Sequence, residues 1–268
     1  MSIIGFIGCG NMAQAIIGGI LASDYVPADH IIASARSPKT LENAATQFGI
    51  RTTLHNKDVA KEADVLFLAV KPNQYAKVMT MISDYLKEDV LIVSMAAGVT
   101  INQMEDTLGD DRKIVRTMPN TPSFVRQGMT AYTVNGKVSK DEKYLINELL
   151  EQFGKAEEIS EQLMDAIPAV SGSSPAYGFV MIEAMGDAAV KQGIPRDQAY
   201  RMAAQSMLGA AAMVLETGDH PALLKDRVCS PGGATIEAVM ELERSGFRHS
   251  IQSAMEACTN KSIAMGKK

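Results

Sequence analysis

The chain has 268 residues, of which 46% are hydrophobic and 21% are charged, as expected for an ordinary packed globular protein. Its net charge of −5 argues against a nucleic-acid-binding protein, which would usually present a basic face. No apolar run reaches membrane-spanning length, and the three scattered cysteines favour a reduced, cytoplasmic protein over a disulfide-bonded secreted one.

Strand and helix signals alternate through the first 160 residues. Short apolar runs predict strands over residues 3–7, 31–33, 65–70, 91–94 and 113–116. Residues 12–22 and 38–48 have helical patterns, with Ser37 as the expected N-cap of the second helix and Pro38 in its first turn. Strands that alternate with helices predict a parallel, doubly wound sheet.

A glycine-rich motif joins the first predicted strand to the first helix. Its residues are Gly8, Cys9, Gly10, Asn11, Met12 and Ala13. They fit the pattern G-x-G-x-x-A, in which the first glycine makes a tight turn and the second lets a pyrophosphate approach the backbone. The position of the motif between a strand and a helix predicts a Rossmann-type dinucleotide-binding domain over residues 1–160. A strand–helix turn without a ligand is the alternative.

The end of the second strand favours NADP(H) as the cofactor. An NAD-binding domain usually carries an acidic residue there, which binds the ribose. This chain has Ser34 and Arg36 instead, which offer hydrogen bonds and a positive charge to a 2′-phosphate. The alternative is that Arg36 is a solvated loop charge.

Ligands of open parallel sheets bind in a crevice beyond the carboxyl ends of the strands. The ends of two further predicted strands are therefore expected to line the crevice that holds the cofactor. The first segment is Ala69, Val70, Lys71 and Pro72, and the second is Ala96, Ala97 and Gly98. The loop over residues 118–122 contains two prolines, and it is either a ligand loop or only a stiff turn.

Helical patterns alone fill the chain after residue 160. They predict helices over residues 175–191, 195–217, 235–244 and 249–265, which form an all-helical domain over residues 161–268. The first of these helices is apolar around most of its circumference and must therefore be buried. About a hundred residues make a thin domain for such burial, so we expect a second subunit to cover part of it; a compact monomeric bundle is the alternative.

The run over residues 228–235, Val-Cys-Ser-Pro-Gly-Gly-Ala-Thr, predicts an anion site at a helix start. Two adjacent glycines leave backbone N–H groups approachable, and the helix dipole favours a carboxylate or phosphate there. Lys225 and Arg227 either raise the local positive potential or are solvated charges.

The sequence offers no convincing acid–base pair, since none of the four histidines lies in an interpretable motif, and no metal-binding motif is present. A dinucleotide domain with a carboxylate site therefore suggests hydride transfer that needs little proton chemistry from the protein. Reduction of a C=N bond is such a reaction.

Six motifs carry a resemblance to a known family. In chain order they are GFIGCGNMAQAI, AVKP, AAGVTI, MPNTP, SGSSPAY and CSPGGATIEAVMELE. Together they resemble pyrroline-5-carboxylate reductase over nearly the whole chain. The resemblance implies reduction of L-1-pyrroline-5-carboxylate to L-proline with NADPH or NADH, the final step of proline biosynthesis. It also implies a helical dimerisation domain and a homodimer, or a larger ring of dimers.

The resemblance also assigns roles to individual residues. The cofactor would be held by Ile7, Gly8, Cys9, Gly10, Asn11, Met12, Ser34, Arg36, Asn56, Ala69, Val70, Lys71, Pro72, Ala96, Ala97 and Gly98. The substrate would be bound by Ser171, Ser173, Gly233, Ala234 and Thr235, and the Thr235 hydroxyl would take the catalytic position near the ring nitrogen. Ser174 replaces a glycine of the family's turn, and Cys229 stands where many relatives have Thr or Ser.

Two other functions compete with this reading. A β-hydroxyacid dehydrogenase has a catalytic lysine on its long interdomain helix, but residues 171–187 contain none, and Lys191 lies near the helix end. A paralogue that has lost catalysis would bind the nucleotide only as a sensor or regulator. The intact glycine motif and the residue 230–235 run count against it.

Overall fold

The computed structural model describes residues 2–266 of the chain. These residues form two compact units. The first contains the chain up to Ser173 and again from Cys258, and the second is Ser174–Ala257. None of the helices within residues 2–266 is long and apolar enough to cross a membrane.

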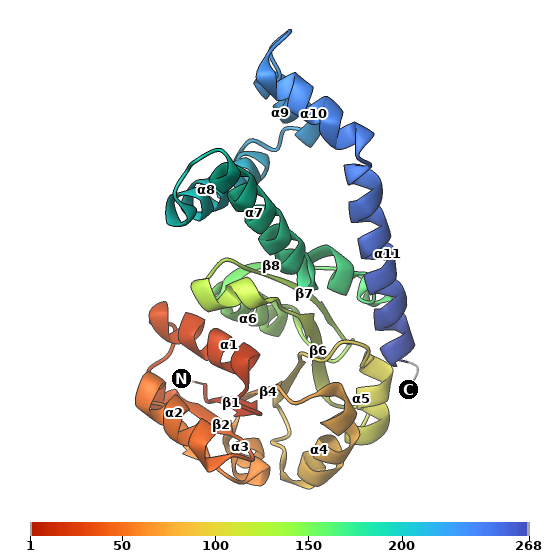
Figure 1. Cartoon of the computed structure of the whole chain (residues 1–268). Helices are drawn as coiled ribbons and strands as arrows, with labels where there is room; N and C mark the ends of the chain where they lie inside the picture. Colours follow the sequence, from red (N-terminus) through yellow and green to blue (C-terminus); the bar gives the residue numbers. More distant parts are fainter. Residues whose placement is uncertain (1, 267–268) are drawn as a thin grey trace. The chain divides into compact units, whose positions relative to one another are not determined.

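An eight-stranded sheet forms the centre of the first unit (Figure 1). Its strands are β1 Ile4–Ile7, β2 Ile31–Ser34, β3 Arg51–Thr53, β4 Val65–Leu68, β5 Leu91–Ser94, β6 Lys113–Met118, β7 Gly128–Val134 and β8 Gly154–Glu158. They lie in the order β3-β2-β1-β4-β5-β6-β7-β8. The first six are parallel, which confirms the predicted doubly wound sheet, whereas β7 is antiparallel to β6 and β8 follows the direction of β7.

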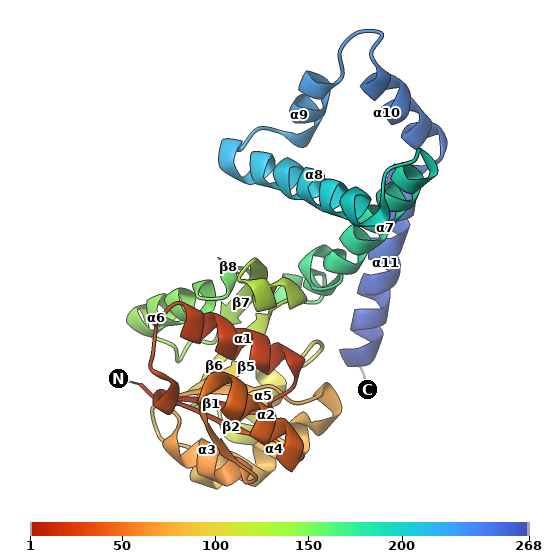
Figure 2. The ribbon, with the colours of Figure 1, turned by 60° about the vertical axis from the view of Figure 1, so that its left-hand side comes forward.

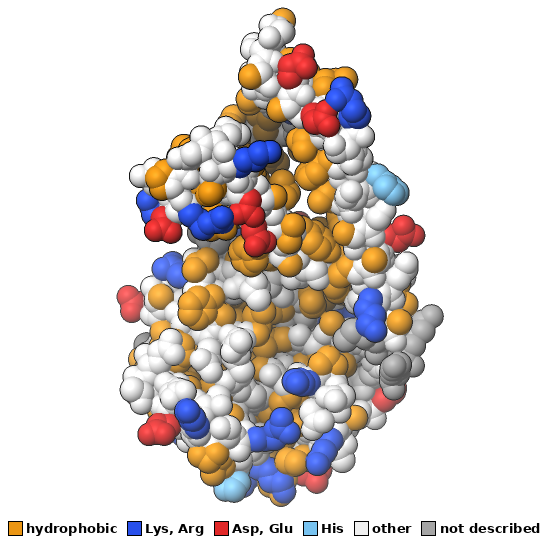
Figure 3. Space-filling model, viewed as in Figure 1, with side chains coloured by type: hydrophobic (Ala, Val, Ile, Leu, Met, Phe, Trp, Pro, Cys, Tyr) orange, Lys and Arg blue, Asp and Glu red, His pale blue; other side chains and the backbone are white. Residues whose placement is uncertain are grey.

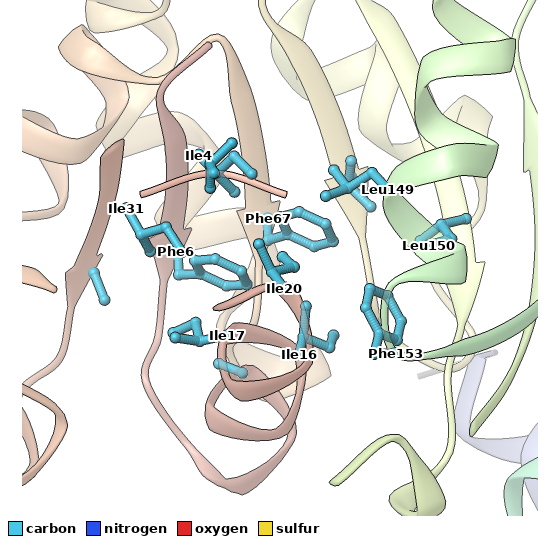
Figure 4. Close-up of a cluster of buried hydrophobic side chains, with 14 of the residues drawn as sticks. Ile4, Phe6, Ile16, Ile17, Ile20, Ile31, Phe67, Leu149, Leu150 and Phe153 are labelled. Carbon is cyan, nitrogen blue, oxygen red and sulfur yellow. The ribbon is translucent and has the colours of Figure 1, made fainter. Parts of the chain in front are cut away.

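Helices cover both faces of this sheet. They are α1 Asn11–Ala22, α2 Pro38–Phe48, α3 Asn56–Glu62, α4 Tyr75–Ile82, α5 Ile101–Leu108 and α6 Lys140–Glu151. One buried cluster joins the strands to α1 and α6, and a second joins them to α3, α4 and α5. Figure 4 shows the first cluster, in which Phe6 of β1 and Phe67 of β4 stack with ring centroids 4.8 Å apart. The continuous apolar strands are therefore those that both helix layers bury.

Local side-chain caps fix where several helices begin. The Ser37 hydroxyl accepts a hydrogen bond from the Thr40 N–H, which confirms the predicted cap of α2. Thr100 with Gln103 and Ser139 with Glu142 form capping boxes at the starts of α5 and α6. The helices α2 and α5, which begin at the carboxyl edge of the sheet, thus start at positions set by the sequence.

Helices alone make up the second unit. They are α7 Ser174–Lys191, α8 Arg196–Thr217, α9 Pro221–Val228, α10 Ala234–Arg244 and α11 Phe247–Gly266, whose last part belongs to the first unit. The four predicted helices are confirmed, and α9 was not predicted. α7 and α8 lie side by side (Figures 1 and 2), so close that a Cβ on Gly186 would lie 2.4 Å from the Tyr200 ring.

The helix that was expected to be buried is largely exposed in the single chain. Gly186 is the buried residue of α7, while Phe179 and Val180 are each 64% exposed. Figure 3 shows hydrophobic side chains on the visible surface of this unit. Because so much apolar surface is unfavourable in water, the burial that the pattern predicts requires more than this one chain.

Candidate active site

The strand order places a crevice at the carboxyl ends of β1 and β4. The chain passes from β1 outward to β3 on one side, and then returns to β4 on the other side of β1, which is the position where open sheets bind ligands. A cavity of about 320 Å³ lies there. It is lined by Gly8, Cys9, Gly10, Ala35, Arg36, Ser37, Thr40, Asn56, Ala69, Val70, Lys71, Gln74 and Val78.

Gly8 and Gly10 have the two roles expected of the glycine motif. Gly8 has a φ of +100°, and a Cβ there would lie 2.5 Å from the Ala69 carbonyl oxygen. Nothing lies within 4 Å of a Cβ on Gly10, which is the N-cap of α1 and has no side-chain cap. The open N–H groups of this first helical turn fit a pyrophosphate.

The other residues of the motif contribute mainly backbone. Ile7 is fully buried, and its carbonyl oxygen accepts a hydrogen bond from the Ala69 N–H at 2.8 Å. Burial raises the pKa of the Cys9 thiol to about 11, so this thiol stays protonated near neutral pH. Asn11 is exposed and Met12 is half-buried in the first turn of α1.

Ser34 is placed differently from the prediction. It is fully buried and does not line the cavity, and its hydroxyl donates a hydrogen bond to Oδ1 of Asn56 at 2.8 Å. In this structure the single hydroxyl proton of Ser34 is donated to Asn56, so a direct contact from Ser34 to a 2′-phosphate stays a prediction. The bond instead orients the Asn56 amide, which leaves the Asn56 NH₂ group available to a ligand.

Arg36, in contrast, lies where the prediction put it. It is exposed, lines the cavity and forms no ion pair with any residue among 2–266. Ser37 and Thr40 line the same cavity at the start of α2, although the sequence reading used Ser37 only as a cap. A helix start directly after the second strand was the signal for them, although Pro38 has no N–H group and the Thr40 N–H is already bonded to Ser37.

The segments expected on the nicotinamide side lie at the ends of β4 and β5. Ala69, Val70 and Lys71 line the first cavity. Lys71, Pro72, Ala97 and Gly98 line a second cavity of about 840 Å³ between α4 and α5. Lys71 is thus shared by both, whereas Ala96 is 4% exposed and lines neither.

Asn120 of the residue 118–122 loop ties the predicted serine turn to the sheet. Its Nδ2 donates to the Ser171 carbonyl oxygen at 2.9 Å, and its Oδ1 accepts from the Met129 N–H at 2.9 Å. The Ser173 hydroxyl lies 3.2 Å from the Cys258 sulfur. The loop therefore has a structural role that the sequence reading left open, and it carries Asn120 as a residue that reading missed.

In the second unit, the residue 230–235 run forms a helix start, as predicted. Gly233 is the N-cap of α10, and Ala234 and Thr235 are its first two residues. The Gly233 N–H is not free, however, because it donates to the Ser230 carbonyl oxygen at 3.0 Å. The bare donors are consequently those of Ala234 and Thr235, which have no partner within the helix.

The charged residues before this run are paired. Lys225 lies 2.6 Å from Asp226, and Arg227 lies 2.5 Å from Asp219. These carboxylates offset much of the positive potential that the two side chains would add. Cys229 ends α9 as a free, half-buried thiol.

Among residues 2–266, no cluster of His, Cys, Asp or Glu side chains is arranged to hold a metal ion. The polar candidates of the first unit are Arg36, Asn56 and Lys71, which line the first cavity, and the candidate of the second unit is Thr235 at the start of α10.

Two family models match different parts of the chain. Residues 161–265 match the family described as pyrroline-5-carboxylate reductase dimerisation, and residues 3–98 match the family described as NADP oxidoreductase coenzyme F420-dependent. The pyrroline-5-carboxylate reductase of Escherichia coli is 50% identical over 264 residues, which cover 98% of each chain. That of Arabidopsis thaliana is 37% identical over 97% of this chain and 94% of its own.

Solved structures agree with these sequence matches. A pyrroline-5-carboxylate reductase from Coxiella burnetii superimposes with a TM-score of 0.89 at 40% identity, over 97% of both chains. A pyrroline carboxylate reductase from Plasmodium falciparum, solved with NADP bound, gives a TM-score of 0.90 at 32% identity over 99% of this chain and 98% of its own. By sequence and by fold, the chain belongs to the pyrroline-5-carboxylate reductase family.

Proposed function

We propose that this chain reduces L-1-pyrroline-5-carboxylate to L-proline with NADPH as the hydride donor, the final step of proline biosynthesis. The observation that carries the proposal is the glycine motif, Gly8 to Ala13, which lies at the carboxyl ends of β1 and β4. The chain that contains it is 50% identical to a pyrroline-5-carboxylate reductase. NADH is the second donor. NADPH ranks first because Arg36, which has no ion-pair partner among the described residues, lines the cavity at the end of β2.

The cofactor half of the reaction falls to residues of the first unit. The N–H groups at Gly10, Asn11 and Met12 hold the pyrophosphate, and Arg36 with Asn56 holds the adenosine end. The ends of β4 and β5 hold the nicotinamide, through Ala69 to Pro72 and Ala96 to Gly98. When bound, NADPH supplies the hydride.

The substrate half falls to the start of α10. The N–H groups of Ala234 and Thr235 bind the carboxylate, and the Thr235 hydroxyl contacts the ring nitrogen, whose proton comes from solvent. Gly233 keeps the loop closed through its bond to Ser230, and Ser171 and Ser173 are further substrate contacts. The proposal keeps a cofactor domain over residues 1–160 and a substrate domain over residues 161–268, although Ser171 and Ser173 belong to the first compact unit.

Catalysis in this scheme is positional. An exposed carboxylate at a helix start gains only about 0.3–1 kcal/mol from the dipole. Holding two reactants at reacting distance accounts for roughly 7–11 kcal/mol of a barrier. The anion site therefore serves chiefly to orient the substrate, which suits a site without an acid–base pair.

The purified chain, assayed for NADPH oxidation with racemic pyrroline-5-carboxylate, tests the proposal. Ala234→Pro removes one carboxylate donor at the first helical position, where proline is well tolerated and the preceding Gly233 is already extended. Loss of a charge-assisted hydrogen bond of about 1.5–3 kcal/mol predicts a KM for the substrate raised roughly 10- to 100-fold. NADPH affinity should not change.

Ala234→Ser is the matched control, because it alters the side chain and keeps the N–H group. An unchanged KM in Ala234→Pro would show that the carboxylate site is elsewhere. NADPH binding without any turnover in the unmodified chain would instead favour a silent nucleotide sensor. The names of the relatives support the reductase over that sensor.

We propose a homodimer as the working unit and a ring of dimers as its larger assembly. The match of residues 161–265 to a dimerisation family and the exposed apolar surface of α7 support the dimer. We also propose the cytoplasm as its location, supported by three cysteines that are all free thiols.

A further inference from the structure

Tyr75 is a buried tyrosine whose hydroxyl lies between two strand ends. It is the first residue of α4 and is 2% exposed. Its hydroxyl donates a hydrogen bond to the Leu68 carbonyl oxygen, which ends β4. The same oxygen accepts a hydrogen bond from the Met95 N–H at 3.0 Å, and the Ser94 hydroxyl lies 3.3 Å away.

The Tyr75 hydroxyl lies at the point where the pairing of β4 with β5 ends. Leu68 and Ser94 are the last paired residues of β4 and β5, and beyond them the two strands separate. Directly past that pair, the tyrosine oxygen bridges the ends of β4 and β5, where the next backbone hydrogen bond between the strands would lie. It therefore fixes where each strand end leads.

Each strand end runs directly into a segment that lines the crevice. Leu68 is followed by Ala69, whose N–H is also held by the Ile7 carbonyl and whose own carbonyl fills the space beside Gly8. Met95 is followed by the segment that contains Ala97 and Gly98. One hydroxyl thus sets the spacing of both segments assigned to the nicotinamide.

We propose that Tyr75 is a positioning residue for hydride transfer: its hydroxyl holds the two nicotinamide-binding segments at the spacing that the reaction needs. Tyr75 also lines the second cavity, beside Pro72 and Ala97. This inference rests on the proposed function, because it takes the assignment of those segments from it. It concerns the nicotinamide end alone. The adenosine end is held by Arg36 and Asn56, which Tyr75 does not contact.

The bridge persists over the working pH range. Burial raises the pKa of Tyr75 to about 12, so the hydroxyl keeps the proton that it donates to Leu68. Its ring packs in the second buried cluster, and Tyr75→Phe preserves that packing. The substitution therefore removes the bridge and little else.

Tyr132→Phe is the matched control. Tyr132 is a second buried tyrosine of the same unit, 4% exposed, and its hydroxyl contacts Oδ1 of Asn147 at 3.2 Å rather than a strand end. Both variants delete one buried hydroxyl and keep the ring. Only Tyr75→Phe should alter the nicotinamide site.

The experiment compares kcat with the affinities of two nucleotides in the full chain. NADPH contains both ends of the cofactor, while 2′,5′-ADP contains only the adenosine end. We expect Tyr75→Phe to lower kcat at least fivefold and to weaken NADPH more than 2′,5′-ADP, whose inhibition constant stays within twofold. Tyr132→Phe should leave all three values within twofold of the unmodified chain.

Two results would overturn the proposal. The first is a Tyr75→Phe enzyme with unchanged kcat and unchanged NADPH affinity. The second is an equal loss of affinity for both nucleotides together with a lower Tm, which indicates a structural role only. If Tyr75→Phe does not fold, Ser94→Ala is the substitute, because it removes one hydrogen-bond partner of the Tyr75 hydroxyl. It must lower kcat and NADPH affinity by smaller factors and leave 2′,5′-ADP affinity unchanged.

Failure of the proposed function would be visible separately. An unmodified chain that binds NADPH without reducing pyrroline-5-carboxylate disproves the reaction. The ratio of the 2′,5′-ADP and NADPH dissociation constants still decides the role of Tyr75 in that case. A ratio that Tyr75→Phe leaves unchanged would refute it.

Discussion

Gly8 and Gly10 stand two residues apart and meet opposite surroundings. Gly8 adopts a left-handed φ of +100° against the Ala69 carbonyl, while Gly10 has an ordinary φ of −78° and open space where a Cβ would lie. The first glycine is required by the fold of the protein itself. The second is not required by packing, and its proposed role is to let a phosphate approach the backbone.

This contrast predicts that alanine at the two positions has opposite effects. Gly8→Ala should lower the free energy of unfolding by about 1–3 kcal/mol, because it forces a strained φ and a clash with backbone. Gly10→Ala should cost at most about 1 kcal/mol of stability, because alanine is a poorer N-cap than glycine, and should weaken NADPH binding roughly tenfold, a loss of about 1.4 kcal/mol. Urea unfolding and NADPH titration of both variants measure the two quantities. A stable Gly8→Ala, or a Gly10→Ala that binds NADPH normally, would contradict the assignment.

At the scale of elements, a buried arginine joins three segments around the site. Arg116 of β6 is 3% exposed, and its guanidinium pairs with Glu161 at 3.3 Å and with Asp165 at 2.8 Å. The same Glu161 oxygen accepts a hydrogen bond from the Ile101 N–H at the start of α5. The strand, the helix and the segment that leads to Ser171 are thereby fixed to one another.

Removal of this arginine should cost more than removal of an exposed one. We expect Arg116→Met to lower the free energy of unfolding by about 1–3 kcal/mol. This loss is smaller than that of a fully buried ion pair, because about one-third or more of each carboxylate side chain is exposed. Arg196→Met is the control, since Arg196 pairs with Asp187 on the surface, and it should cost less than about 1 kcal/mol. Equal losses in denaturant unfolding would mean that burial adds nothing to the Arg116 pairs.

The elements that sequence reasoning found and missed differ in how they are buried. The strands from β1 to β6 that are continuous apolar runs were predicted, because helices cover both their faces. β3 and β8, with the sequences Arg-Thr-Thr and Gly-Lys-Ala-Glu-Glu, lie at the two edges of the sheet and have too few apolar residues to give a strand signal. β7, Gly128–Val134, was not predicted either, and its direction depends on its pairing with β6, which no local pattern encodes.

The site was predictable to the same depth. Helix starts follow from local sequence, so those at Gly10 and Gly233 were located correctly, while their binding roles stay predictions. Side-chain roles depend on distant partners. The bond between Ser34 and Asn56 spans 22 positions, and that between Asn120 and Ser171 spans 51, so neither could be read from a motif.

At the scale of the whole molecule, the second unit has a hydrophobic core that is small for the length of its helices. α7 and α8 together span 40 residues, 18 and 22, yet their buried residues are Gly186, Ala199 and Ala203. Large side chains on both helices are exposed, among them Phe179 at 64% and Leu215 at 82%. Surface of this kind is stable in water only when another subunit covers it.

A charge placed in this surface should therefore separate the subunits. Phe179→Glu buries an unpaired carboxylate in the assembled protein, which the dimer cannot accommodate without loss of contact. We expect sedimentation to show a lower mass, and the Tm to fall and to lose its dependence on protein concentration. Leu54→Glu, on an exposed loop of the first unit at 53% exposure, is the control and should change neither. If Phe179→Glu keeps the mass of the unmodified protein, α7 lies outside the interface, and the apolar surface of this helix must have another purpose.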